Sequence, residues 1–112
     1  MKATTIAIAS ALLCASSQAH ASPVYLRCTF PQMEPIDVTL DEGQGTATVY
    51  LASRNRTMPF RAAFSANEVR FGSSQISYVI SRVDMSIIRT IRLTSGVENG
   101  SCSKAEIPKR QF

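Results

Sequence analysis

From Val24 to Cys102, apolar and polar residues alternate along most of the chain with a period of two, and no segment shows the 3.6-residue period of an amphipathic helix. Successive side chains of an extended strand point to opposite faces, so each alternating segment has one apolar face to bury. Short clusters of Gly, Ser, Asn and Asp interrupt the alternation and predict turns. The expected strands cover residues 24–30, 36–41, 47–51, 58–64, 69–71 and 76–80, followed by a long bulged strand over 83–93 and, after a hairpin turn at Asn99-Gly100, a last strand through Cys102.

This pattern predicts an all-β fold of about 7–8 short antiparallel strands joined in chain order. Such a meander curls into a small barrel or packs as a two-sheet sandwich, and both architectures satisfy the alternation. The chain contains no internal repeat, no low-complexity stretch and no linker between domains. A single domain is therefore expected.

The first 21 residues are typical of a cleaved secretory signal peptide. Lys2 supplies a positive charge, an apolar segment without acidic residues follows, and Ala19-His20-Ala21 places small side chains where signal peptidase requires them. We expect cleavage after Ala21 and an exported β domain, residues 22–112, that is periplasmic or secreted. The apolar segment has about ten residues, whereas a membrane-spanning helix needs ~20, so no transmembrane anchor is expected.

Two cysteines, Cys28 and Cys102, remain once the leader and its Cys14 are removed. They lie near opposite ends of a mature chain of 91 residues (112 less the 21 of the leader) and reach an oxidising compartment, so we expect a disulfide between them. The bond would fasten the first strand to the last, which matters because a chain this short buries little more than ~60% of its unfolded surface. Two free thiols are the alternative.

The mature chain lacks the residues on which most catalytic and metal sites depend. Its only histidine, His20, leaves with the leader, which excludes Ser-His and Cys-His pairs, and a bonded cysteine cannot act as a nucleophile or a zinc ligand. Asp37, Asp41 and Glu42 form a small acidic cluster that could suit calcium or a glycosidase pair, but a turn and a solvated strand face explain it more simply. We expect no enzyme activity, no cofactor and no metal.

Arginine is the residue type that points to a partner. The precursor has nine arginines and three lysines, and 11 basic against 8 acidic residues remain without Lys2, a formal charge of about +3. The planar guanidinium suits carboxylates and phosphates, so the predicted partner is a protein or an anionic envelope polymer. Alternatively, exposed strands carry these charges for solubility and against edge-to-edge aggregation. The candidate anion-binding surface comprises Arg82, Arg89 and Arg92, together with Arg54, Arg56 and Arg61 around another connection.

Arg89 also shares the alternation of the neighbouring isoleucines, which would place it on an inward face. Nucleic acid is a less favoured partner, because Tyr25, Tyr50 and Tyr78 lie on strands where they are expected to pack rather than to stack on bases.

Four segments of the chain carry a resemblance to known proteins: Cys28, Tyr78-Val79-Ile80-Ser81-Arg82, Gly100-Ser101-Cys102 and Lys109-Arg110-Gln111-Phe112. Their arrangement resembles small bacterial periplasmic β-barrel domains with two terminal cysteines, to which no activity is assigned. The architecture also resembles the small barrel inhibitors of c-type lysozyme. In those inhibitors a Ser-Gly motif followed by tyrosine enters the lysozyme cleft, whereas Ser95-Gly96 has no tyrosine nearby, and a basic chain would repel a basic lysozyme.

Three functions are therefore consistent with the sequence. The first is an exported binding module that engages a protein or an anionic envelope component. The second is an envelope-associated structural accessory that has no specific ligand. The third is an inhibitor of a hydrolase such as lysozyme. Binding that is purely electrostatic would weaken steeply with salt, whereas a packed interface would persist.

Overall fold

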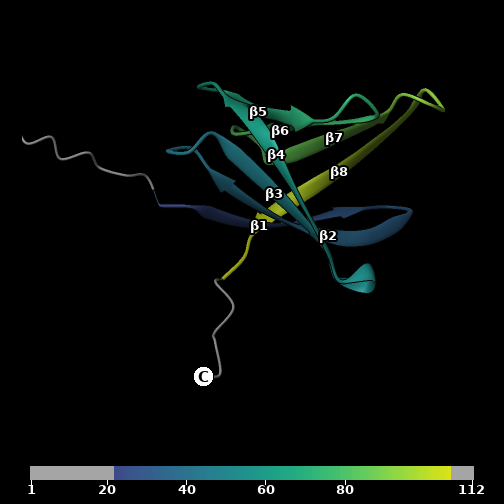
Figure 1. Ribbon diagram of the computed structural model, residues 1–112, viewed down its shortest axis with the longest axis horizontal. Helices are drawn as coiled ribbons and strands as arrows, with labels where there is room; N and C mark the ends of the chain where they lie inside the picture. The colour runs from purple at the N-terminus through teal and green to yellow at the C-terminus, as the bar shows by residue number, and fades with distance from the viewer. Residues whose placement is uncertain (1–21, 107–112) are drawn as a thin grey trace, which may run out of the picture.

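Residues 22–106 are described by the computed structural model, and they form one closed barrel of eight antiparallel strands (Figure 1). Each strand pairs with the next along the chain and β8 pairs with β1, so the all-β meander prediction is confirmed, as a barrel and not as a sandwich. The proposed signal peptide and the basic residues beyond Glu106 lie outside the described residues. Within 22–106, no helix is long and apolar enough to cross a membrane.

The elements are β1 (Val24–Phe30), β2 (Met33–Asp41), β3 (Thr46–Leu51), the short 3-10 helix η1 (Ala52–Arg54), β4 (Arg56–Phe64), β5 (Glu68–Gly72), β6 (Ile76–Ser81), β7 (Ser86–Ile91) and β8 (Gly96–Lys104).

The inward faces of the strands supply the core, as the alternation predicts. On β1, Leu26, Cys28 and Phe30 are buried, whereas Arg27 and Thr29 between them are exposed. Full burial of one Val, Leu, Ile or Phe side chain contributes about 1.5–3 kcal/mol, so this interior is the main source of stability. The buried core consists of Leu26, Cys28, Phe30, Ile36, Val38, Leu40, Ala47, Val49, Val69, Phe71, Tyr78, Ile80, Ile87 and Cys102.

The disulfide expected between Cys28 and Cys102 is present, and it lies where the barrel closes. Cys28 and Cys102 stand directly opposite each other in a short ladder that pairs residues 26–29 of β1 with residues 101–104 of β8. The two cysteines are 74 residues apart in sequence, and closing a loop of that length contributes roughly 4.5 kcal/mol in the chain-entropy model. The bond therefore reinforces the junction between the first and last strands of the described chain.

Since consecutive strands are antiparallel neighbours, alternate connections gather at the same end of the barrel. We call one end the mouth and the other the base. In Figure 1 the mouth faces right, where η1 lies, and the base faces left. The mouth carries the connections 31–32, 52–55, 73–75 and 92–95, and the base carries 42–45, 65–67 and 82–85.

Residues 83–93 do not form the single bulged strand that their apolar pattern predicts. A turn covers residues 82–85, and β7 begins only after it. The Ser81 hydroxyl oxygen accepts a hydrogen bond from the Asp84 N–H at 3.2 Å, and the Asp84 carboxylate accepts one from the Ser86 N–H at 2.9 Å. The Ser86 N–H is the main reason that the pKa of Asp84 lies below its usual value. These local hydrogen bonds stabilise a turn at a point where hydrophobic alternation alone favours a strand.

Asn99-Gly100 is not a hairpin turn, because it lies inside β8 opposite residues 87–88 of β7. The turn between these strands covers residues 92–95. A Cβ atom at Gly100 would lie 2.3 Å from the Thr29 carbonyl oxygen and 2.8 Å from the Phe30 ring. This glycine therefore permits a close approach between β8 and β1.

The barrel wall is only partly paired between β4 and β5. Residues 62–64 of β4 pair with β5, whereas residues 56–61 pair with β3 alone. The β4–β5 ladder ends before Gly72, whose φ is 151° and whose Cβ, if it had one, would lie 2.2 Å from the Ile76 carbonyl oxygen. We call the unpaired stretch between residues 56–61 and the β5–β6 hairpin the seam.

Pro59 lies on the strand edge that faces the seam. The Ala62 N–H donates to the Gly45 carbonyl at 2.8 Å on the β3 side, so the backbone groups of residue 59, three positions away, point to the opposite side. Proline has no N–H, so no ladder hydrogen bond is lost there, and an added strand would lack one donor. The residue thereby protects an unpaired edge against strand addition.

The disulfide predicts a large and measurable stabilisation. The variant Cys28→Ala/Cys102→Ala is expected to lose about 4 kcal/mol in the free energy of unfolding, measured by urea denaturation, because its unfolded chain is no longer constrained. Peptide mapping of the wild-type protein without reductant should recover one linked pair and no free thiol. Equal urea midpoints for the variant and the wild type would show that the bond does not fasten the barrel.

We expect any side chain at position 72, at the end of β5, to destabilise the protein. Gly72→Ala is expected to lower the free energy of unfolding by at least about 2 kcal/mol, because its Cβ collides with backbone atoms that cannot move aside. Gly43→Ala is the matched control, since its Cβ would meet only the Asp41 carboxylate at 3.6 Å, and a change within ~0.5 kcal/mol is expected. Urea denaturation measures both changes, and equal losses in the two variants would show that the end of β5 does not require glycine.

Candidate functional site

A cavity of about 740 Å³ opens at the mouth of the barrel. This volume lies within the ~300–1,000 Å³ typical of small-molecule sites. Its wall combines charged, polar and apolar side chains from β2, β3, η1, β4, the β5–β6 connection, β6 and β7. The charged members are Arg54, Arg56, Arg89 and Glu34, the polar ones are Ser53, Ser73, Gln75 and Tyr78, and the apolar ones are Met33, Leu51, Met58, Phe60 and Ile76.

Arg89 reaches this cavity because it occupies an inward position of β7, two residues after the core residue Ile87. Only 18% of its side chain is exposed. Its guanidinium forms an ion pair with Glu98, which stands directly opposite on β8, and donates a hydrogen bond to the Met33 sulfur at 3.4 Å. Of the two placements that the sequence allows for Arg89, the structure has the inward one.

The Arg89 guanidinium is held charged but is not fully hydrogen-bonded. Burial lowers the pKa of Arg89, whereas hydrogen bonds with Glu98 and Tyr78 raise it, and the net direction is upward. Its Nε is buried and has no hydrogen-bond partner among the residues described. An unpartnered buried donor costs about 1–3 kcal/mol, so the ion pair with Glu98 does not satisfy every donor of this guanidinium.

Arg54 and Arg56 form the cationic rim of the cavity. They flank Asn55, whose φ of 45° reverses the chain between η1 and β4. The Tyr50 hydroxyl donates to the Asn55 side-chain oxygen at 3.1 Å and braces this turn. Both arginines are exposed, and neither forms an ion pair within residues 22–106.

Arg82 lies at the opposite end, where it ties the connections of the base together. Its guanidinium pairs with Glu42 at 3.0 Å and donates to the Ser65 carbonyl at 2.8 Å, so it joins the connections that precede β3, β5 and β7. Arg92 lies in the β7–β8 connection at the mouth but does not line the cavity. Arg61 is exposed on β4 and lies on the outer wall.

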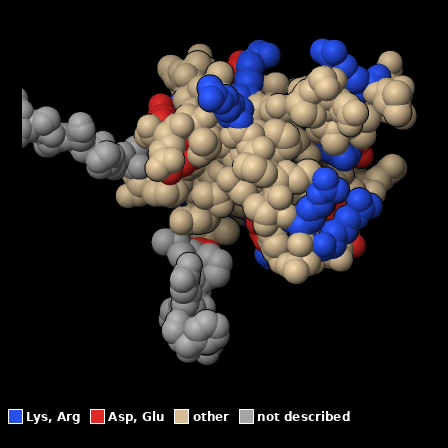
Figure 2. All heavy atoms as spheres, in the orientation of Figure 1, with Lys and Arg blue, Asp and Glu red and all other residues tan. Residues whose placement is uncertain are grey.

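The candidate arginines therefore do not form one surface. Figure 2 shows the basic side chains of one face as separate groups, with carboxylates among some of them. The structure brings Arg54, Arg56 and Arg89 together at the mouth cavity and separates Arg61, Arg82 and Arg92 from it.

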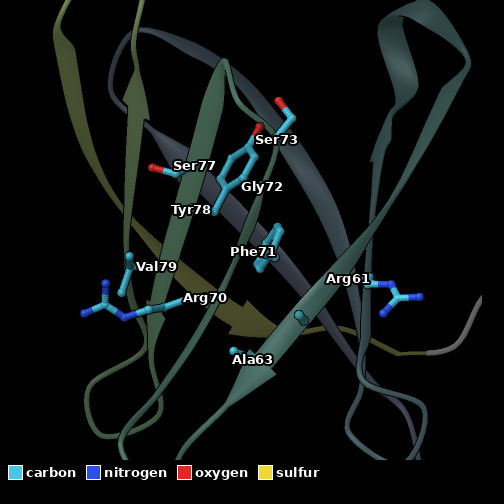
Figure 3. A pocket seen from close by; sticks show the side chains of 10 residues that line it. Arg61, Ala63, Arg70, Phe71, Gly72, Ser73, Ser77, Tyr78 and Val79 are labelled. Carbon is cyan, nitrogen blue, oxygen red and sulfur yellow. The ribbon is translucent and has the colours of Figure 1, made fainter.

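A shallower hollow of about 490 Å³ lies on the outside of the barrel, over the seam. Figure 3 shows that Arg61 and Arg70 point away from one another on opposite sides of it, while the Phe71 and Tyr78 rings lie between the strands. Arg70 is also paired with Glu68 at 2.9 Å. Charged groups that diverge do not make a convergent binding site, so the mouth is the stronger candidate.

An aromatic cluster separates the outer hollow from the mouth cavity. Phe71 and Tyr78 are stacked with ring centroids 5.0 Å apart, and Phe60 is tilted against them at 5.8 and 6.2 Å. Tyr78 and Ser73 line both the hollow and the mouth cavity. The cluster fills the barrel beneath the mouth and closes its wall at the seam.

A third cavity, of about 350 Å³, lies at the base. Apolar core side chains line most of it, and its charged members are Glu42, Arg82 and Lys104. Since Glu42 and Arg82 are already paired with each other, this cavity offers less unpaired charge than the mouth.

Sequence reasoning missed two features of the mouth. Glu98 was not recognised as the partner of Arg89, although it shares the inward alternation of Cys102 on β8 and so gave a usable signal. The apolar wall of the cavity gave no signal in the sequence. Met33 and Met58 belong to different hairpins, and only the tertiary fold brings them to one cavity.

Fold and site together define a small disulfide-closed barrel with a cationic cavity at one end. Comparison with known proteins finds no matching family model, no matching curated protein and no matching solved structure.

The ion pair at the mouth predicts that Arg89 and Arg92 respond differently to the same substitution. Arg89→Gln is expected to lower the free energy of unfolding by about 1–3 kcal/mol, because it leaves the Glu98 carboxylate, 31% exposed, without its partner. The exposed Arg92→Gln is expected to change it by less than ~0.5 kcal/mol. Urea denaturation measures both changes.

A double-mutant cycle tests whether that loss of stability comes from the ion pair between Arg89 and Glu98. Glu98→Gln alone should also destabilise the protein, and Arg89→Gln/Glu98→Gln should be more stable than the sum of the single changes predicts. Strict additivity would show that the two side chains do not interact in solution.

Proposed function

We propose that this chain is an exported binding module that holds an anionic ligand, a component of the cell envelope, in its mouth cavity. The observation that supports the proposal best is the convergence of three arginines on one cavity. Arg54 and Arg56 have no carboxylate partner within the described part of the chain, so their donors are free to meet a ligand. A guanidinium binds carboxylates and phosphates through two parallel hydrogen bonds, which gives direction as well as attraction.

The charge balance of the mouth supports an anion. Glu34 lines the cavity, and Glu98 is paired with Arg89, so these two carboxylates offset two of the three arginines. One positive charge remains in excess at a concave site, where field lines concentrate.

The outer surface is less suited to this role, which argues against an accessory that binds anionic polymer without specificity. Outside the mouth, several arginines are paired with neighbouring carboxylates, which lowers the net positive charge of those surfaces. These pairs are Arg27 with Asp37 at 2.9 Å, Arg70 with Glu68 at 2.9 Å and Arg82 with Glu42 at 3.0 Å.

Export is the other part of the proposal. The N-terminal sequence has the three regions of a cleaved leader, and the Cys28–Cys102 bond is of a kind that forms in an oxidising compartment. A ligand met in that compartment belongs to the envelope or to the surroundings of the cell, not to the cytoplasm.

Capture from envelope extract on immobilised protein tests the proposal. Arg54→Gln/Arg56→Gln is expected to retain at least about 10-fold less anionic material than the wild type, because removing both rim charges weakens binding by 1.4 kcal/mol or more. Arg61→Gln/Arg70→Gln is the matched control, since it removes the same charge from the outer wall, and it should retain the wild-type amount at physiological salt.

Two results would contradict the proposal. Equal losses in both variants would show that overall charge, and not the mouth, determines binding. Capture that disappears entirely between low and physiological salt, in the wild type as in the variants, would favour the nonspecific accessory.

A further inference from the structure

The mouth cavity has an apolar wall in addition to its arginines. Met33, Leu51, Met58, Phe60 and Ile76 are half-buried and pack against the core with one side. Their other side lines the cavity. An apolar wall that no part of the described chain covers is suited to hydrocarbon, and methionine side chains adapt to irregular apolar ligands.

Along β4, the cationic side chain lies at the rim of the cavity and the apolar side chains lie deeper. Arg56, Met58 and Phe60 occupy successive inward positions of β4, so the wall changes from cationic at the rim to apolar further in. A strand rises ~3.3 Å per residue, which places Phe60 about 13 Å along the strand from Arg56. A ligand that matches this gradient has an anionic end and an apolar tail.

The interior limits the size of such a ligand. The Phe60, Phe71 and Tyr78 rings fill the barrel below the mouth, and the residues beyond them are close-packed core. An eight-stranded barrel is just wide enough for its own side chains or for one small ligand. One chain fits this space, whereas a lipid with two acyl chains would need a wider cavity.

The polar groups of the rim do not favour a sugar instead. The Ser73 hydroxyl oxygen already accepts hydrogen bonds from the N–H groups of Gln75 and Ile76, at 3.2 and 3.4 Å. The Tyr78 side chain interacts with Arg89 and raises the pKa of its guanidinium. The other uncharged polar groups, Ser53 and Gln75, are fewer than the five apolar side chains of the wall, which would leave most hydroxyls of a saccharide without partners.

We infer that the ligand of the mouth is a single-chain anionic amphiphile, with its carboxylate or phosphate headgroup at Arg54 and Arg56 and its hydrocarbon chain against Met58 and Phe60. This inference rests on the proposed function and specifies the class of ligand. The single excess positive charge of the mouth matches a headgroup of low charge. A free fatty acid and a monoalkyl phosphate share this chemistry.

Calorimetric titration of the oxidised protein, with each amphiphile below its critical micelle concentration, tests the inference. Dodecanoate and monododecyl phosphate are the two anionic probes, and the tighter of them identifies the headgroup. Dodecyltrimethylammonium has the same chain with the opposite charge, and acetate and inorganic phosphate have the charge without the chain. Both anionic dodecyl probes are expected to bind at least about 10-fold more tightly than the other three, a difference of 1.4 kcal/mol or more.

Variants assign the two halves of the ligand to the two halves of the cavity. Arg54→Gln/Arg56→Gln should weaken dodecanoate binding about 10-fold and remove the preference over the cationic probe. Met58→Ser should weaken dodecanoate binding and leave acetate binding unchanged. Arg61→Gln/Arg70→Gln, on the outer wall, should bind every probe as the wild type does. Circular dichroism at the titration temperature confirms that each variant is folded.

The outcomes distinguish this inference from the proposal on which it rests. Equal affinity for the cationic and anionic dodecyl probes, or for acetate and dodecanoate, would overturn the amphiphile. No binding of any dodecyl probe, together with envelope capture that depends on Arg54 and Arg56, would also overturn it but would leave an anion-binding mouth. Loss of that dependence in the capture experiment would overturn both.

Discussion

Closure between β1 and β8 is the constraint on which the rest of this structure depends. Residues 26–29 and 101–104 come from opposite ends of the described chain, so their pairing carries the full entropy of loop closure. The Cys28–Cys102 bond lies within that short ladder and reduces this cost by restricting the unfolded chain. With β1 and β8 joined, neither the first nor the last strand of the described chain is left at an edge, and a chain of modest length obtains a continuous core.

The strand pairing of the barrel wall is incomplete at the seam. The β4–β5 ladder ends before Gly72, and Pro59 has no N–H on the strand edge that is left unpaired. The aromatic cluster of Phe60, Phe71 and Tyr78 fills this gap in the wall from inside the barrel.

Electrostatics distinguishes the mouth from the remaining surface. The arginines of the base and outer wall that hold ion pairs serve the fold, as Arg82 does when it links three connections. Arg54 and Arg56 have no such role in the described structure, and Arg89 is held rigidly behind them by Glu98. The mouth therefore combines one arginine fixed by its ion pair with two rim arginines that hold no ion pair in the described structure.

Much of the fold could be read from the sequence, because alternation, turn composition and a lone pair of cysteines are local or countable signals. They predicted the all-β fold, most of the strands and the disulfide. They did not predict the turn at 82–85, where Ser81 and Asp84 hydrogen-bond to the backbone, or the role of Gly100, whose close neighbours Thr29 and Phe30 are distant in sequence. The sequence alone determined which side chains share a face of each strand, since that depends only on the period of two. Only the tertiary structure decided that Arg54, Arg56 and Arg89 meet at one cavity while Arg82 lies at the other end, because barrel closure and strand register set those distances and neither is a local property of the chain.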